Sequence, residues 1–185
     1  TYRAAALHGS RPYDARAMTR TGRSVCRARV EAWKYTNLTR MGRTKFVPAL
    51  KAEKPSLDNV PKGALDVDAP KLVLVNGLLR SDLSDMDALP KGLSVSPLAT
   101  AMGSNAERLK DVLGQINVGH PMPMLALNAA YLNDGLVIDI DADTDVEMPV
   151  HIVSIGIGAA QPIAFHPRNL IFAGSNSQAT VYESH

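Results

Sequence analysis

The last third of the chain is a series of short apolar segments separated by turn signals. The predicted strands span residues 136–140, 150–155, 169–173 and 179–184. In the first of them Leu136, Ile138 and Ile140 alternate with other residues and share one face. The strand centres lie about 10–19 residues apart, a spacing typical of all-β folds. No helix of crossover length separates them, so a dinucleotide-binding fold is disfavoured and a sandwich, a barrel or a β-solenoid remain open.

The middle of the chain shows mixed strand and helix signals. An apolar run at 71–75 predicts a buried strand, and Asn76-Gly77 after it is a tight-turn signal. Residues 81–87 predict a turn with one helical turn, and residues 93–95 predict another short strand.

Two short helices are predicted next. The first covers 97–102, with Ser96 as its cap, and Gly103 ends it. The second begins at Ser104, which can form a capping box with Glu107. Its apolar face consists of Leu109, Val112, Leu113 and Ile116.

A further apolar segment at 124–131 predicts a buried helix. Gly135 follows it at the place where a left-handed C-terminal cap is expected. This segment and the strand after it mark the transition from the α/β part of the chain to the β part.

Charge is distributed unevenly along the chain. Residues 1–45 carry a net charge of +9, whereas residues 46–185 carry −7. Residues 1–30 are rich in arginine and lack any helical or strand period, so we expect a disordered or mis-translated head. We expect an α/β N-terminal region over 31–134 and a separate β region over 135–185.

An alternating series of carboxylates is the densest candidate for chemistry. It contains Asp139, Asp141, Asp143, Asp145 and Glu147. Neither register of a calcium-binding loop places glycine at its sixth position and glutamate at its twelfth. We therefore interpret the series as a strand end followed by a solvated acidic turn.

Other candidate sites lack the necessary partners. The five histidines are not spaced as zinc ligands, and Cys26, as the only cysteine, can neither form an internal disulfide nor hold an iron–sulfur cluster alone. We interpret His166-Pro167-Arg168, just before a predicted strand, as a group that packs a turn and satisfies backbone carbonyls. The residues predict no catalytic, cofactor-binding or metal site.

Five motifs in a fixed order nevertheless resemble a known family. They are residues 33–38 (Trp-Lys-Tyr-Thr-Asn-Leu), 74–77 (Leu-Val-Asn-Gly), 127–130 (Leu-Asn-Ala-Ala) with 134–135 (Asp-Gly), 146–150 (Val-Glu-Met-Pro-Val) and 166–171 (His-Pro-Arg-Asn-Leu-Ile). In this order they resemble the SufB/SufD family of the SufBCD iron–sulfur cluster assembly complex. The first motif favours the SufD branch, and the resemblance covers about residues 31–185.

The resemblance implies a fold and a function. The fold would be an α+β N-terminal region leading into a right-handed parallel β-helix, truncated after its first coils. The protein would be a cytoplasmic, non-catalytic scaffold that pairs with a SufB-like paralogue and a SufC-like ATPase. The full complex would handle the iron–sulfur cluster, and this chain would bind no cofactor, nucleic acid or membrane itself.

The chain also departs from the family. It begins with Thr1 and stops within a predicted strand. From the resemblance we expect the family's C-terminal partner-docking part to be absent from these residues. Residues 1–29 replace the usual helical segment, so we hypothesise a frame-shifted translation there. A β-helix cut after its first coils exposes a strand edge, so we expect residues 1–185 expressed alone to be poorly soluble.

Two alternatives stay open. The first is a β-solenoid enzyme acting on polysaccharide, which would stack Asp/Glu pairs on successive coils. The second is a nucleic-acid-binding module that uses the arginine-rich head, with Trp33 and Tyr35 stacking on bases.

Overall fold

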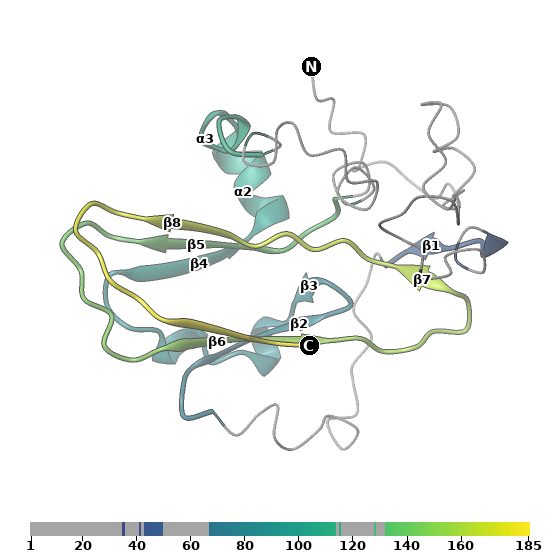
Figure 1. Ribbon diagram of the computed structural model, residues 1–185, viewed down its shortest axis with the longest axis horizontal. Coiled ribbons are helices and arrows are strands. Elements are labelled where there is room, and N and C mark those ends of the chain that lie inside the picture. The colour runs from purple at the N-terminus through teal and green to yellow at the C-terminus, as the bar shows by residue number, and fades with distance from the viewer. Residues whose placement is uncertain are drawn as a thin grey trace.

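Two β-sheets face each other in the computed structural model (Figure 1). The structure describes residues 35, 41, 43–49, 67–113, 115, 128 and 132–185. One sheet contains, in order, β3 (Leu78–Leu79), β2 (Lys71–Val75), β6 (Val150–Ile155) and β9 (Val181–Ser184). The other contains β4 (Leu93–Pro97), β5 (Leu136–Ile140) and β8 (Leu170–Ala173). A separate pair joins β1 (Val47–Pro48) to β7 (Ile163–Ala164).

Each large sheet contains a parallel strand pair that joins segments a little over 30 positions apart, in addition to the parallel pairing of β2 with β6. Strand β8 pairs with β5 at an offset of 33 positions, as in Val137 with Leu170. Strand β9 pairs with β6 at an offset of 31 positions, as in Val150 with Val181. The chain therefore repeats its course, first through β5 and β6 and then through β8 and β9. All four predicted strands of this region are confirmed, with β8 and β9 starting one and two residues later than predicted.

The turns between the sheets repeat as well. Asp143 and Asn176 both adopt left-handed backbone, with φ of 55° and 57°. The Asn176 Nδ2 donates a hydrogen bond to Asp143 Oδ1 at 3.0 Å. Asp145 and Gln178 then form a parallel bridge. Aspartate and asparagine tolerate this backbone conformation better than other non-glycine residues, so the two corners can have the same shape.

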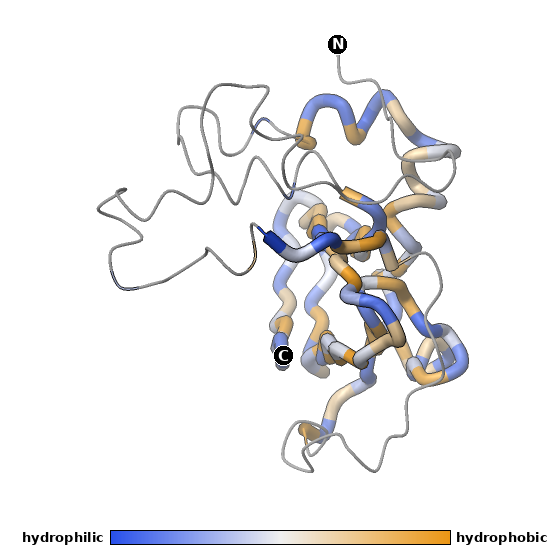
Figure 2. The backbone as a smooth tube through the Cα atoms, turned by 90° about the vertical axis from the view of Figure 1, so that its right-hand side faces the viewer, coloured by the Kyte–Doolittle hydropathy of each residue, from blue (hydrophilic) through white to orange (hydrophobic). Residues whose placement is uncertain are grey.

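The core fills the space between the two sheets. Its buried members are Leu72, Leu74, Leu93, Leu136, Ile138, Ile140, Val146, Val150 and Ile152. The predicted face of the first strand is confirmed, because Leu136, Ile138 and Ile140 all belong to this core. Hydrophobic and hydrophilic positions alternate along parts of the described backbone (Figure 2). Strands β2, β5 and β6 instead bury consecutive residues, so both faces of these strands are covered.

Helices cover the outer face of the β4-β5-β8 sheet (Figure 1). They are α2 (Leu98–Ser104) and α3 (Ala106–Lys110). Leu98 of α2 and Leu109 of α3 are buried in a cluster with Val137 and Leu170 of the sheet. The predicted apolar face of the second helix is confirmed at Leu109, while Ile116 lies outside the described residues.

The other sheet begins with a tight hairpin. Strand β2 turns through Asn76 (φ 50°) and Gly77 (φ 79°) into the antiparallel strand β3. Positive φ at both central residues is the type I′ geometry that Asn-Gly favours, so this prediction is confirmed. The 3₁₀ turns η5 (Ser81–Leu83) and η6 (Met86–Ala88) follow and confirm the predicted helical turn.

The predicted caps of both helices are wrong. Ser96 is a residue of β4, paired with Val137, and the N-cap position of α2 is Pro97. Gly103 does not end α2, which continues to Ser104. Ser104 is thus the last residue of α2, and its Oγ donates a hydrogen bond to the Thr100 carbonyl at 3.1 Å. Pairing of β4 with β5 keeps Ser96 extended, so its local capping preference is overridden.

Several predictions fall outside the described residues. These are the head at 1–30, the helix at 124–131 apart from Asn128, and the Trp33 side chain. The division of the chain at residue 135 stays a prediction; strands from both sides of it share the two large sheets. Within the described ranges, no helix is long and apolar enough to cross a bilayer.

Candidate functional site

Polar motifs from distant parts of the chain meet at one end of the β5–β8 pair. The Arg168 guanidinium donates a hydrogen bond to the Asn128 side-chain oxygen, and Asn128 Nδ2 donates to the Pro167 carbonyl at 3.3 Å. The Arg168 backbone N–H donates to the Asp134 carbonyl at 3.0 Å. Two of the five sequence motifs, the first of them through both of its parts, are therefore joined by hydrogen bonds here. We call the set of Asn128, Asp134, Gly135, Arg168 and Asn169 the motif junction.

Asp134 connects the motif junction to a helix. Its carboxylate Oδ1 accepts a hydrogen bond from the Ala99 backbone N–H at 3.0 Å, in the first turn of α2. The Gly135 carbonyl accepts one from the Leu98 N–H at 3.0 Å. The Asp134 carboxylate therefore accepts a hydrogen bond from a backbone amide at the start of α2, although Asp134 and Ala99 are 35 positions apart in the sequence.

Gly135 is required by close packing. An added Cβ there would lie 2.0 Å from the Arg168 carbonyl oxygen, and its φ is +150°. Gly174, at the other end of the same strand pair, would place a Cβ 2.4 Å from the Ala142 nitrogen. The predicted role of Gly135 as a left-handed helix cap is wrong in detail, because its φ lies far from the left-handed helical value and its carbonyl is used by α2.

Asn169 completes the motif junction on its inner side. Its Oδ1 accepts a hydrogen bond from the Leu136 N–H at 3.2 Å, and its Nδ2 donates to Glu183 Oε1 at 2.9 Å. Asn169 thus links both sheets, since Leu136 belongs to β5 and Glu183 to β9. The amide side chain meets both demands because it carries a donor and an acceptor.

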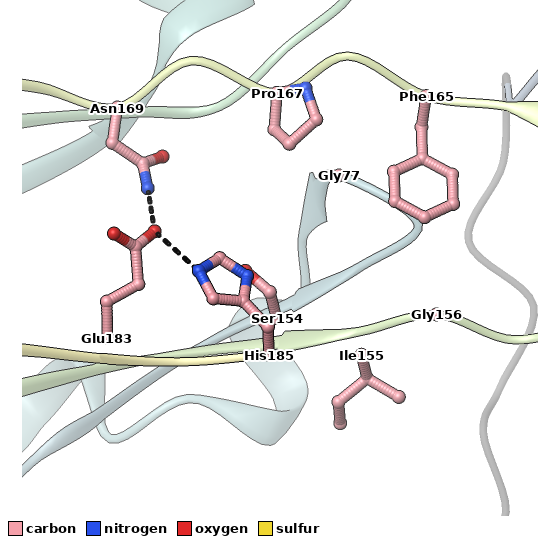
Figure 3. A pocket seen from close by; sticks show the side chains of 9 residues that line it. All are labelled: Gly77, Ser154, Ile155, Gly156, Phe165, Pro167, Asn169, Glu183 and His185. Carbon is pink, nitrogen blue, oxygen red and sulfur yellow. Dashed lines mark hydrogen bonds and ion pairs between the residues drawn. The ribbon is translucent and has the colours of Figure 1, made fainter. Parts of the chain in front are cut away.

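A cavity of about 450 Å³ opens beside the motif junction (Figure 3). Its lining residues are Gly77, Ser154, Ile155, Gly156, Phe165, Pro167, Asn169, Glu183 and His185. Figure 3 shows Asn169, Pro167 and Phe165 along the segment that connects β7 to β8, with Glu183 and His185 on the opposite side. His185 Nε2 lies 3.9 Å from Glu183 Oε1, which is an ion pair only when the histidine is protonated. The Asn-Gly turn is close to the same wall, because a Cβ on Gly77 would lie 3.2 Å from the Pro167 side chain.

The acidic series does not form a site. Asp141, Asp143, Asp145 and Glu147 are exposed, as predicted. Asp139 is the exception, because Arg108 of α3 forms an ion pair with it. The Arg108 guanidinium also lies over the Phe172 ring, 3.8 Å from its centroid, which is a cation–π contact. No group of three or more possible metal ligands occurs among the described residues.

Comparison with known proteins identifies the family. The family model described as the SufBD protein N-terminal region matches residues 4–152, well over half of the chain. The chain belongs to the SufBD family. The match extends over nearly all of the arginine-rich head and over most of the strands described above.

A curated SufBD relative supports this. The iron–sulfur cluster assembly SufBD family protein of Synechocystis sp. is 29% identical over 160 residues, which is 85% of this chain. The same match covers 34% of the relative, so the chain spans about a third of the length of this SufBD protein. The predicted resemblance to the SufB/SufD family is thus confirmed; its assignment to the SufD branch stays a prediction.

Within this SufBD chain, sequence reasoning identified the components of the motif junction but missed how they are connected. It interpreted His166-Pro167-Arg168 as a turn-packing group, and the Pro167 carbonyl does accept a hydrogen bond. The bond from Arg168 to Asn128 spans 40 positions, and no local pattern signals it. Burial lowers the pKa of His166, so this residue favours its neutral form.

Removing the carboxylate of Asp134 tests its capping role. Asp134→Ala is expected to lower the free energy of unfolding by about 0.5–2 kcal/mol, because the Ala99 amide loses its acceptor. Asp134→Asn keeps an acceptor oxygen and should cost only a fraction of this. Urea denaturation of the full-length protein followed by circular dichroism measures both. Equal losses in the two variants would contradict a capping role.

Proposed function

We propose that this SufBD chain is the N-terminal part of a non-catalytic scaffold subunit for iron–sulfur cluster assembly. The match of the family model over residues 4–152 carries the proposal. The related Synechocystis protein is named for the same process. The scaffold would pair with a SufB-like paralogue and a SufC-like ATPase in the cytoplasm. The segment at 33–38 favours the SufD branch over SufB.

We further propose that β5, β6, β8 and β9 are the first coils of a parallel β-solenoid. Three observations support this: the parallel register of β8 on β5, that of β9 on β6, and the stacked corners at Asp143 and Asn176. Parallel pairing between equivalent strands of successive coils is what a β-helix repeats. A two-sheet sandwich joined by hairpins would pair these strands antiparallel instead.

The stacking does not favour a polysaccharide-active enzyme. Such an enzyme is expected to place carboxylates above one another on successive coils. Among the paired positions that the structure describes, Asp139 stacks on Phe172, Asp145 on Gln178 and Ile152 on Glu183. None of these pairs contains two carboxylates, so we retain the scaffold as the proposed function.

Co-purification of the full-length protein tests the scaffold role. We expect it to form a stable complex with the SufB-like paralogue and the SufC-like ATPase on co-expression, measured by size-exclusion chromatography with mass detection. A variant that lacks residues 1–29 is the control for the nucleic-acid alternative. If the scaffold proposal is right, this variant still binds both partners, and only its binding to nucleic acid can differ from that of the full-length protein. Failure of the full-length protein to bind either partner would overturn the proposal.

A further inference from the structure

One buried histidine lies at the contact between the two repeats. His151 of β6 is fully buried, and its neighbours Val150 and Ile152 belong to the inner core. Because side chains alternate along a strand, His151 points to the outer face of the sheet. Its register partners are Lys71 of β2 on one side and Tyr182 of β9 on the other.

The hydrogen bonding of this imidazole is incomplete. Its Nε2 lies 2.8 Å from the Ser184 hydroxyl oxygen on β9. Its Nδ1 is buried, and no described residue provides it with a hydrogen-bond partner. A neutral ring can meet the Ser184 contact with one proton on Nε2. A protonated ring would carry a second N–H, on Nδ1, without an acceptor among these residues.

The charges around His151 oppose protonation further. Burial lowers the pKa of His151, and the positive charge of Lys71, which lies on the same face, lowers it further. Tyr182 is the titratable group beside it on β9, while Glu183 points to the inner side and accepts from Asn169. The Asp85 carboxylate is bound to the backbone N–H of Lys71 at 2.9 Å. Among the described residues, no carboxylate forms a hydrogen bond or an ion pair with the imidazole.

We propose that His151 and Ser184 form an acid-sensitive joint that holds β9 on β6 while the imidazole is neutral and weakens when it is protonated. Protonation would place a buried charge beside Lys71 and leave a donor without an acceptor. Both costs are relieved when β9 separates locally and water reaches the ring. The joint would therefore loosen the contact between the two repeats without involving the β5–β8 pair on the opposite sheet.

The direction of the pH dependence follows from the pKa of the ring. Burial, and then the charge of Lys71, lower the pKa of His151 below its ordinary value of 6.5. The open state therefore binds a proton before the closed state as pH falls. The stability that the joint contributes is complete above about pH 6.5, is lost as pH falls through the lower closed-state pKa, and changes no further below it.

Hydrogen exchange of the full-length protein tests this joint. After correction for intrinsic rates, exchange of the Val181–Ser184 amides should rise by about tenfold for each pH unit between 6.5 and the closed-state pKa. Exchange of the β8 amides is the internal reference and should not rise with it. His151→Val, which matches Val153 on the same face, should abolish the rise, and His185→Ala should leave it unchanged.

A second variant keeps the histidine. Ser184→Ala should raise β9 exchange about two- to tenfold already at pH 7.5, because the hydroxyl contact is lost. Titration of the imidazole by NMR in the unmodified protein should give a midpoint below 6.5. A midpoint at or above 6.5, an equal rise in β8, or an unchanged rise in His151→Val would each overturn the joint.

Discussion

Gly135→Ala is expected to abolish folding or to cost about 4 kcal/mol or more of the free energy of unfolding. The new Cβ would overlap the Arg168 carbonyl oxygen, which lies 2.0 Å from its ideal position. The contacting atom belongs to the backbone of the paired segment, so it cannot move without separating β5 from β8. Since whole domains are stable by only about 5–15 kcal/mol, one such clash removes a large share of the total. Soluble yield and urea denaturation of the full-length protein measure the effect.

A second glycine provides the matched control. An added Cβ on Gly103, within α2, meets no atom within 4 Å. Gly103→Ala should therefore stabilise the protein by up to about 1 kcal/mol, because alanine favours the helix. The pair makes the same chemical change, so a similar loss in both variants would show that steric overlap at Gly135 is not the cause.

The second large effect concerns two isoleucines that are register partners. Ile138 is fully buried between the sheets, and Ile171, its partner on β8, is 49% exposed. Ile138→Ala should cost about 2–5 kcal/mol through lost burial and the cavity that remains. Because Ile171 is half exposed here, Ile171→Ala should lower the free energy of unfolding by less than Ile138→Ala does, in proportion to the apolar area that the Ile171 side chain buries.

The same comparison tests the proposed solenoid. If a further coil stacks on β8 in the full-length protein, it covers Ile171, and Ile171→Ala should then cost about as much as Ile138→Ala. If nothing stacks there, the cost of Ile171→Ala stays well below that of Ile138→Ala. Urea unfolding of the two variants in parallel separates these outcomes, and the second would count against a continuing solenoid.

Strands were predictable from sequence where local pattern and tertiary pairing agree. The alternation of Leu136, Ile138 and Ile140 and the Asn-Gly turn were enough to place β5 and the β2–β3 hairpin. Both signals are local, because the residues on one face of a strand recur with a period of two and a type I′ turn needs positive φ. The pairing partners were not predictable, since the residues of β2 pair with residues of β6 that lie 80 positions later.

The helix starts and the motif junction were harder to predict for the same physical reason. Ser96 and Ser104 have the side chains of helix caps, but neither occupies the cap position. The acceptor for α2 comes instead from Asp134, which is adjacent only after β4 and β5 have paired. His151 likewise looked isolated in the sequence, because its contact with Ser184 exists only when β9 lies on β6.

The two offsets between the repeats, 33 positions for β5 and β8 but 31 for β6 and β9, have a practical consequence. The corners match through the bridge of Asp145 with Gln178, so the difference arises between this bridge and the following strand. In the first repeat that segment contains the exposed Glu147 and Met148. Both strands keep their register although the connections differ in length. We therefore expect this corner to accept a short inserted peptide tag without a change in the register of either sheet.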